Sequence, residues 1–294
     1  MTSIKVFIQN HPVLTYSALT FAISWGGMFL AVGLGGPPAN EEQSAMFLIL
    51  SYIAMLAGPS LGGLLLTGVI DGKDGYRQLR AQLFKWRVGA RWTMIALLTA
   101  PLLIVVTLLT LSLISPEFLP RLYTEDDKVF LLQFSIVAGI MVGVFEELGW
   151  TGFVMPRMKW DYGTLKTGLI IGLIYAAWNF PVVFWVSTAT GTAGSLPMII
   201  FMPAVLFTWI PAYRVFMVWV YDHVESLLVA MLMHASLIAF WRIFTPLALT
   251  GAALVTYYLV FTAVMWVINI AVLRLETLHR PGQGQAAIGI PNQK

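Results

Sequence analysis

The chain has 294 residues, of which 59% are hydrophobic and only 11% are charged. Soluble domains carry about 25% charged residues, so this composition excludes a water-soluble globular protein. It predicts an all-α, polytopic membrane bundle instead. Cysteine is absent, which excludes disulfides and thiolate chemistry. The net charge of +3 comes from basic residues between apolar runs, where they report topology and do not indicate nucleic-acid binding.

About eight apolar runs are long enough to cross a bilayer. They are Pro12–Gly36, Ala45–Ile70, Trp92–Ile114, Val129–Met155, Thr167–Val186, Leu196–Tyr213, Leu227–Phe244 and Gly251–Leu273. No composition shift divides them, so residues 1–280 are predicted to form a single transmembrane domain. The polar stretch 281–294 is predicted to be a disordered cytoplasmic tail.

Basic residues are distributed asymmetrically between the predicted loops. Most of the 17 lysines and arginines fall on one side, including Arg214 after the sixth run. The loop between the third and fourth runs holds Glu117 and Glu125 instead. The positive-inside rule therefore predicts a multi-pass protein of the cell membrane with both termini in the cytoplasm. Between the second and third runs, Asp74–Arg87 alternates basic and apolar residues with a helical period. This pattern predicts an amphipathic helix on the cytoplasmic leaflet.

Ionisable residues inside apolar runs are rare and costly, so they indicate function. Glu146 and Glu147 lie in the fourth run and His234 in the seventh, while the polar Asn179 lies in the fifth. Each of these runs carries a stripe of small residues that permits close helix packing. In the fourth, the stripe is Ser135, Gly139, Gly143, Glu147 and Thr151. Counted from the basic borders, the four polar groups also share one depth. They are therefore predicted to face a common intramembrane site.

The residues around this predicted site resemble three motifs of the CAAX-protease and bacteriocin-processing intramembrane proteases, also called the Abi family. That family reads Glu-Glu-x-x-x-Arg, Phe-x-x-x-His and His-x-x-x-Asn on three successive core helices. The corresponding segments here are Phe145–Arg157, Tyr175–Asn179 and His234–Ile238. The resemblance covers roughly residues 58–240. The chain departs from the motifs at Thr151, Asn179 and Ile238, which stand where the family has Arg, His and Asn.

The resemblance implies a hydrolase of the metallo-endopeptidase-like kind. It implies an activated water that attacks a peptide bond near the cytoplasmic side, with a peptide or protein as substrate. Glu146, Glu147, Asn179 and His234 are then the catalytic candidates. Glutamate would act as the base, His234 would donate to the oxyanion, and Asn179 would orient the water. The sequence identifies no cofactor, and a divalent ion held by Glu146, Glu147 and His234 is a further candidate. These oxygen-rich ligands would favour magnesium, calcium or manganese over zinc.

Two other classes of function compete with the peptidase. The altered motif positions favour a catalytically inactive relative that binds a peptide or membrane partner as an immunity or scaffold protein. Buried carboxylates are also found in proton-coupled transporters. Against a transporter, the sequence shows no pair of broken helices related by internal similarity. The lipid bilayer is a partner under every interpretation.

Overall fold

The computed structural model describes residues 3–32 and 41–279, and the predicted tail 281–294 lies outside them. Within the described residues all regular elements are helical, which confirms the all-α prediction. They are α1 (Ser3–Asn10), α2 (Pro12–Val32), α3 (Glu41–Ile70), α4 (Gly72–Leu83), α5 (Ala90–Ser112), α6 (Arg121–Thr124), α7 (Lys128–Gly149), α8 (Met155–Thr190), α9 (Met198–Leu206), α10 (Trp209–Val224), α11 (Leu227–Phe244) and α12 (Gly251–His279). A 3-10 turn, Pro116–Phe118, precedes α6, and a π-helical segment, Trp150–Val154, joins α7 to α8.

Eight of the described helical stretches are long and apolar enough to cross a membrane. This finding confirms a multi-pass membrane protein. The largest difference from the predicted boundaries lies in the sixth span. The sixth span was predicted to end at Tyr213, but α9 and α10 together form a candidate span over Met198–Val224. Pro203 and Pro211 interrupt the apolar pattern without ending the span, because α9 and α10 meet at a short turn and the apolar run resumes at Val215.

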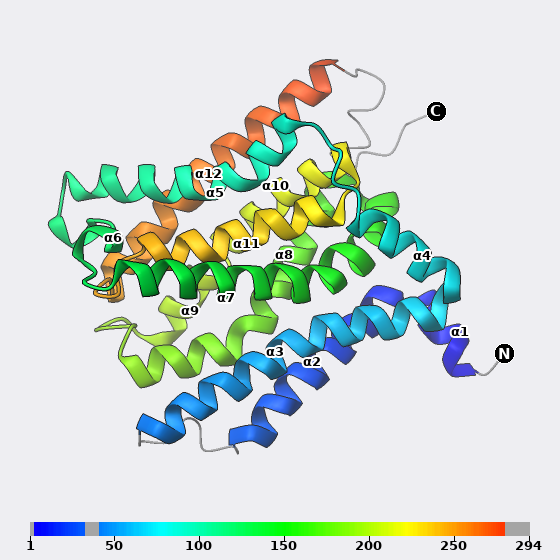
Figure 1. The fold of residues 1–294 in the computed structure, drawn as a ribbon, viewed down its shortest axis with the longest axis horizontal. Coiled ribbons are helices and arrows are strands. Elements are labelled where there is room, and N and C mark those ends of the chain that lie inside the picture. The colour runs from blue at the N-terminus through cyan, green and yellow to red at the C-terminus, as the bar shows by residue number, and fades with distance from the viewer. Residues whose placement is uncertain (1–2, 33–40, 280–294) are drawn as a thin grey trace.

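The bundle is built around the pair α7 and α11, which pack against each other more extensively than any other two elements. Figure 1 shows α5 and α12 on one side of this pair and α2 and α3 on the other. Helix α10 packs on both α8 and α12. Helices α1 and α4 lie at one end of the bundle, and α6 lies at the opposite end (Figure 1). Each motif-bearing helix therefore has protein on several sides.

The glycine stripe of α7 explains how closely α7 approaches α11. A Cβ atom added to Gly143 would meet the backbone and Cβ of Ala235, the latter at 3.0 Å. Gly139 lies in the same way against Ala235 and Ala239. Without side chains at these positions the two backbones nearly touch, which is how membrane helices gain packing energy when lipid offers no hydrophobic drive. This close packing places His234 of α11 beside the glutamates of α7.

Helix α4 is the amphipathic helix that the sequence predicted, although it is shorter than predicted and ends at Leu83. Leu79 is buried and forms a small apolar cluster with Leu227 and Met231 of α11. Tyr76 is 44% exposed, and its hydroxyl donates to the carbonyl of Leu64. The apolar face of α4 therefore packs on the end of α11, and the basic residues of α4 lie on its opposite face.

Candidate active site

The two glutamates occupy the last turn of α7, directly before the π-helical segment. Glu146 is 5% exposed and Glu147 is fully buried. A π-helical segment accommodates an extra residue in the helix and is frequent at functional sites. Here it carries Thr151, whose hydroxyl donates to Oε2 of Glu147.

Glu147 is surrounded by donors from three other helical elements. Its Oε1 accepts from Nη1 of Arg214 at 2.7 Å and lies 2.6 Å from Nδ1 of His234. Since Thr151 bonds the other oxygen, both carboxylate oxygens are occupied by the protein itself. A buried carboxylate is stable only when it is paired and hydrogen-bonded in this way.

Arg214 was placed wrongly by the sequence analysis, which assigned it to a cytoplasmic loop. It lies within α10, is 3% exposed, and forms a salt bridge with Glu147. In the resembled motif, an arginine stands on the same helix as the glutamates, at the position of Thr151. Here Arg214, on a different helix, pairs with the second glutamate instead. The signal was available in the sequence, because the apolar run continues from Val215 to Val220 beyond Arg214.

His234 lies between the two glutamates. Its Nδ1 faces Glu147 at 2.6 Å, and its Nε2 lies 3.9 Å from Oε2 of Glu146. A charge-paired carboxylate only accepts hydrogen bonds, so Nδ1 carries the hydrogen of this contact. Glu147 therefore fixes the orientation of the imidazole and turns Nε2 toward Glu146.

Tyr175 of α8 completes the group, although the sequence analysis gave it no role. Its hydroxyl donates to Oε2 of Glu146 at 2.7 Å and lies 3.3 Å from Nε2 of His234. The guanidinium carbon of Arg214 lies 4.4 Å from the centre of the tyrosine ring, a cation–π contact. Glu146, Glu147, Tyr175, Arg214 and His234 thus form one connected polar cluster, which we call the carboxylate cluster.

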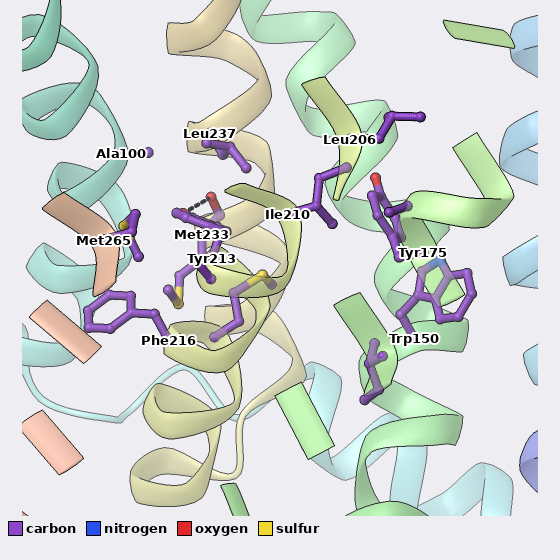
Figure 2. Packing of buried hydrophobic residues seen from close by; sticks show 14 of the residues in the cluster. Ala100, Trp150, Tyr175, Leu206, Ile210, Tyr213, Phe216, Met233, Leu237 and Met265 are labelled. Atoms are coloured by element: carbon purple, nitrogen blue, oxygen red, sulfur yellow. Dashed lines mark hydrogen bonds between the residues drawn. The ribbon is translucent and has the colours of Figure 1, made fainter. Parts of the chain in front are cut away.

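Aromatic side chains enclose the carboxylate cluster. Trp150 packs edge-on against Tyr175, with 5.6 Å between the ring centres, and Trp178 lies 5.4 Å from Tyr175. Figure 2 shows Trp150 and Tyr175 beside each other, with Ile210 nearby. Tyr213, labelled in the same view, donates its hydroxyl to the carbonyl of Met233. These rings keep the surroundings of the polar groups apolar.

Asn179 and Ile238 complete the set of sequence-predicted positions. Asn179 lies one turn beyond Tyr175 and is partly buried, and its amide donates to the carbonyl of Tyr175 at 3.1 Å. That contact is within its own helix. Ile238 lies one turn beyond His234 and adds no polar group. The structure therefore brings together Glu146, Glu147 and His234, and places the Asn179 amide on the backbone beside them.

A divalent ion fits the donors of the carboxylate cluster poorly. Among the residues that the structure describes, no group of three or more His, Asp or Glu side chains is arranged to hold a metal ion. The guanidinium of Arg214 occupies the Glu147 oxygen that also faces His234. A positive charge at this position opposes a second cation.

A polar cleft of about 230 Å³ opens beside the π-helical segment. It lies between the end of α3, the inner side of α4 and the start of α8, and Gly152 and Arg157 form part of its wall. Arg157 bonds Asp71 and the carbonyl of Phe153, which ties the start of α8 to the junction of α3 and α4. Gly152 follows Thr151 directly, so the cleft reaches the segment that contacts Glu147.

Comparisons with known proteins agree with the motif resemblance. Residues 128–240 match the family described as Type II CAAX prenyl endopeptidase Rce1-like. The matched segment contains all five residues of the carboxylate cluster. A stretch of 45 residues is 31% identical to CAAX prenyl protease 2 of Methanococcus maripaludis. That stretch covers 15% of this chain and 17% of the relative's length.

Proposed function

We propose that this chain is an intramembrane endopeptidase of the CAAX-protease and bacteriocin-processing family, a proposal that the Rce1-like match over residues 128–240 supports. One observation carries the proposal. Glu146 and His234, from two different helices, meet at a buried position where a tyrosine hydroxyl bridges them. A carboxylate and an imidazole at this separation are the groups that peptide hydrolysis by an activated water needs.

The two glutamates have different roles in this proposal. Glu147 is held by Arg214, Thr151 and His234, so it is the anchor that orders the cluster. Within the described part of the chain, Glu146 accepts a hydrogen bond from the Tyr175 hydroxyl at Oε2, and its other oxygen is available to a water. Glu146 is therefore the general base that takes a proton from the attacking water. Nε2 of His234 is placed to donate to the oxyanion that forms at the peptide carbonyl.

A substrate peptide must reach a cluster that is closed in this structure. The polar cleft offers a route at the α4 end of the bundle, because its wall at Gly152 adjoins Thr151. The neighbouring Phe145 is 38% exposed on the outer face of α7, which faces lipid in a membrane bundle. The substrate class that fits both features is a peptide with a bilayer-embedded apolar part and a polar part at the membrane surface.

The α4 end of the bundle is proposed to face the cytoplasm. Basic residues gather there, and the positive-inside rule assigns such an end to the cytoplasmic side. Because eight spans return the chain to its starting side, both termini would be cytoplasmic. Reporter fusions after Lys294 and within Glu117–Lys128 are expected to report opposite compartments, with the carboxyl terminus inside. A periplasmic or extracellular signal from the Lys294 fusion would contradict this orientation.

A catalytically inactive, peptide-binding relative is the second candidate. The observation that favours it is that the protein itself occupies both oxygens of Glu147 and one of Glu146. Such a protein would keep its binding partner when Glu146 is changed to glutamine, because the shape is preserved and only the charge is lost. A peptidase would lose turnover in the same variant.

The proposal is tested by incubating purified protein, in detergent, with a peptide library and sequencing the products by mass spectrometry. Cleavage by the wild type and none by Glu146→Ala is expected. If the folded wild type cleaves no peptide, the inactive relative becomes the better interpretation. Cleavage that persists in Glu146→Ala would remove Glu146 from the mechanism.

A further inference from the structure

Among the residues that the structure describes, Tyr175 is the one whose side chain touches both Glu146 and His234, the two reactive groups of the carboxylate cluster. Its hydroxyl lies 2.7 Å from Oε2 of Glu146 and 3.3 Å from Nε2 of His234, whereas those two groups lie 3.9 Å from each other. A proton passing directly between Glu146 and His234 would therefore have to cross more than a hydrogen-bond length. The tyrosine hydroxyl divides this distance into two hydrogen bonds.

The same helix shows two departures from the resembled motif, one turn apart. Tyr175 stands where the motif has phenylalanine, and Asn179 stands where it has histidine. The Asn179 amide donates to the carbonyl of Tyr175, and an amide exchanges no proton near neutral pH. The hydroxyl of Tyr175 both donates and accepts. One departure removes a proton-exchanging group from this helix face, and the other introduces a hydroxyl beside Glu146.

We propose that Tyr175 relays a proton between Glu146 and His234 and so takes the part of the histidine that is absent at position 179. This inference rests on the proposed peptidase function. The relay has two hydrogen arrangements. In one, Nε2 of His234 donates to the tyrosine oxygen while the tyrosine hydroxyl donates to Glu146. In the other, protonated Glu146 donates to the tyrosine oxygen and the hydroxyl donates to Nε2.

The net charge of the carboxylate cluster favours the binding of one proton, which the relay can use. Arg214 contributes one positive charge and the two glutamates contribute two negative charges. A single additional proton makes the buried cluster neutral, which is the favoured state in a low-dielectric surrounding. Glu147 forms a salt bridge with Arg214 and stays ionised, so the proton is shared among Glu146, Tyr175 and His234.

The reaction balances with one passage through the relay. Glu146 takes one proton from water as the water oxygen bonds to the peptide carbonyl carbon, while protonated His234 donates a hydrogen bond to the oxyanion. As the carbonyl re-forms and the carbon–nitrogen bond breaks, the proton of His234 moves to the nitrogen, which leaves as an amine. Glu146 then donates its proton to the oxygen of Tyr175 while the tyrosine hydroxyl donates its own proton to Nε2 of His234, which returns the cluster to its starting protonation without an outside reductant, oxidant or ion.

The surroundings hold the tyrosine ring in the position that a relay requires. Trp150 and Trp178 pack against it, and the guanidinium of Arg214 lies over its face. Tyr175 is only 7% exposed, so bulk water does not substitute for its hydroxyl. Figure 2 shows the ring seated beside Trp150.

Tyr175→Phe removes the hydroxyl and leaves the ring. We expect kcat to fall by about 10²–10⁴-fold, with KM and the melting temperature nearly unchanged. Tyr213→Phe is the matched control, since Tyr213 is also buried but donates to a backbone carbonyl. It should keep wild-type kcat. The double variant Tyr175→Phe/Asn179→His restores the motif residues and should regain at least about tenfold in kcat over Tyr175→Phe.

The relay is overturned if Tyr175→Phe retains wild-type kcat, or if Tyr213→Phe loses as much. It is also overturned if kcat falls only in proportion to the folded fraction. If wild-type protein cleaves no peptide, the proposed function fails separately, and infrared spectroscopy then decides the relay. The carboxylic-acid band that Glu146→Gln removes should shift in Tyr175→Phe but not in Tyr213→Phe. An unchanged band would contradict the shared proton.

Discussion

Glu147→Gln is expected to destabilise the folded protein by about 3–5 kcal/mol, because it leaves the buried Arg214 without its counter-charge. Glutamine keeps the shape of the side chain and its contact with Thr151, so the loss reports charge and not volume. His234 would also lose the carboxylate that orients its ring. The free energy of unfolding, measured by denaturant titration in a fixed detergent, checks the effect.

Two further variants make this result specific to the buried pair. Adding Arg214→Gln to Glu147→Gln removes the unpaired charge and should recover a large part of the loss. Glu125→Gln breaks a more exposed salt bridge with Arg121 and should cost less than about 1 kcal/mol. If Glu147→Gln and Glu125→Gln cost the same, the anchoring role of Glu147 is wrong.

Glu146→Gln is expected to lower peptide cleavage by about 10²–10⁴-fold, the usual cost of losing a general base. Glutamine can still accept the Tyr175 hydroxyl bond, so the fold should survive. The rate is measured on one peptide identified in the library, and the melting temperature is measured on the same preparation. A fall in rate that merely follows a fall in melting temperature would show that Glu146, like Glu147, is structural.

Much of the fold could be predicted from the sequence because the bilayer restricts the possible structures so strongly. Apolar length gives a span, and small residues every fourth position give a packing face. That reasoning placed Gly139 and Gly143 on the face that meets α11. It failed at Tyr213, where prolines interrupt the hydropathy pattern and the predicted span ends about three helical turns before Val224.

Because the sixth span was predicted to end at Tyr213, Arg214 was assigned to a loop. A basic residue at the end of a predicted span is assigned to a loop by default, and the pairing partner that makes burial tolerable lies 67 residues away in the chain. Tyr175 was overlooked for another reason. A tyrosine in an apolar run is usually an interfacial or packing residue, and only the three-dimensional contact with Glu146 distinguishes this one. Both misses are residues whose role depends on a partner on another helix.

Cleavage by wild-type protein reconstituted in lipid vesicles tests the central claim most directly. One peptide sequence is supplied in two forms, either joined to a single membrane-spanning segment or free in solution. The proposed intramembrane endopeptidase should cut the membrane-anchored form near the side of the bilayer that α4 faces, and much faster than the soluble form. Equal cleavage of both forms, or no cleavage of the anchored form by folded protein, would contradict it.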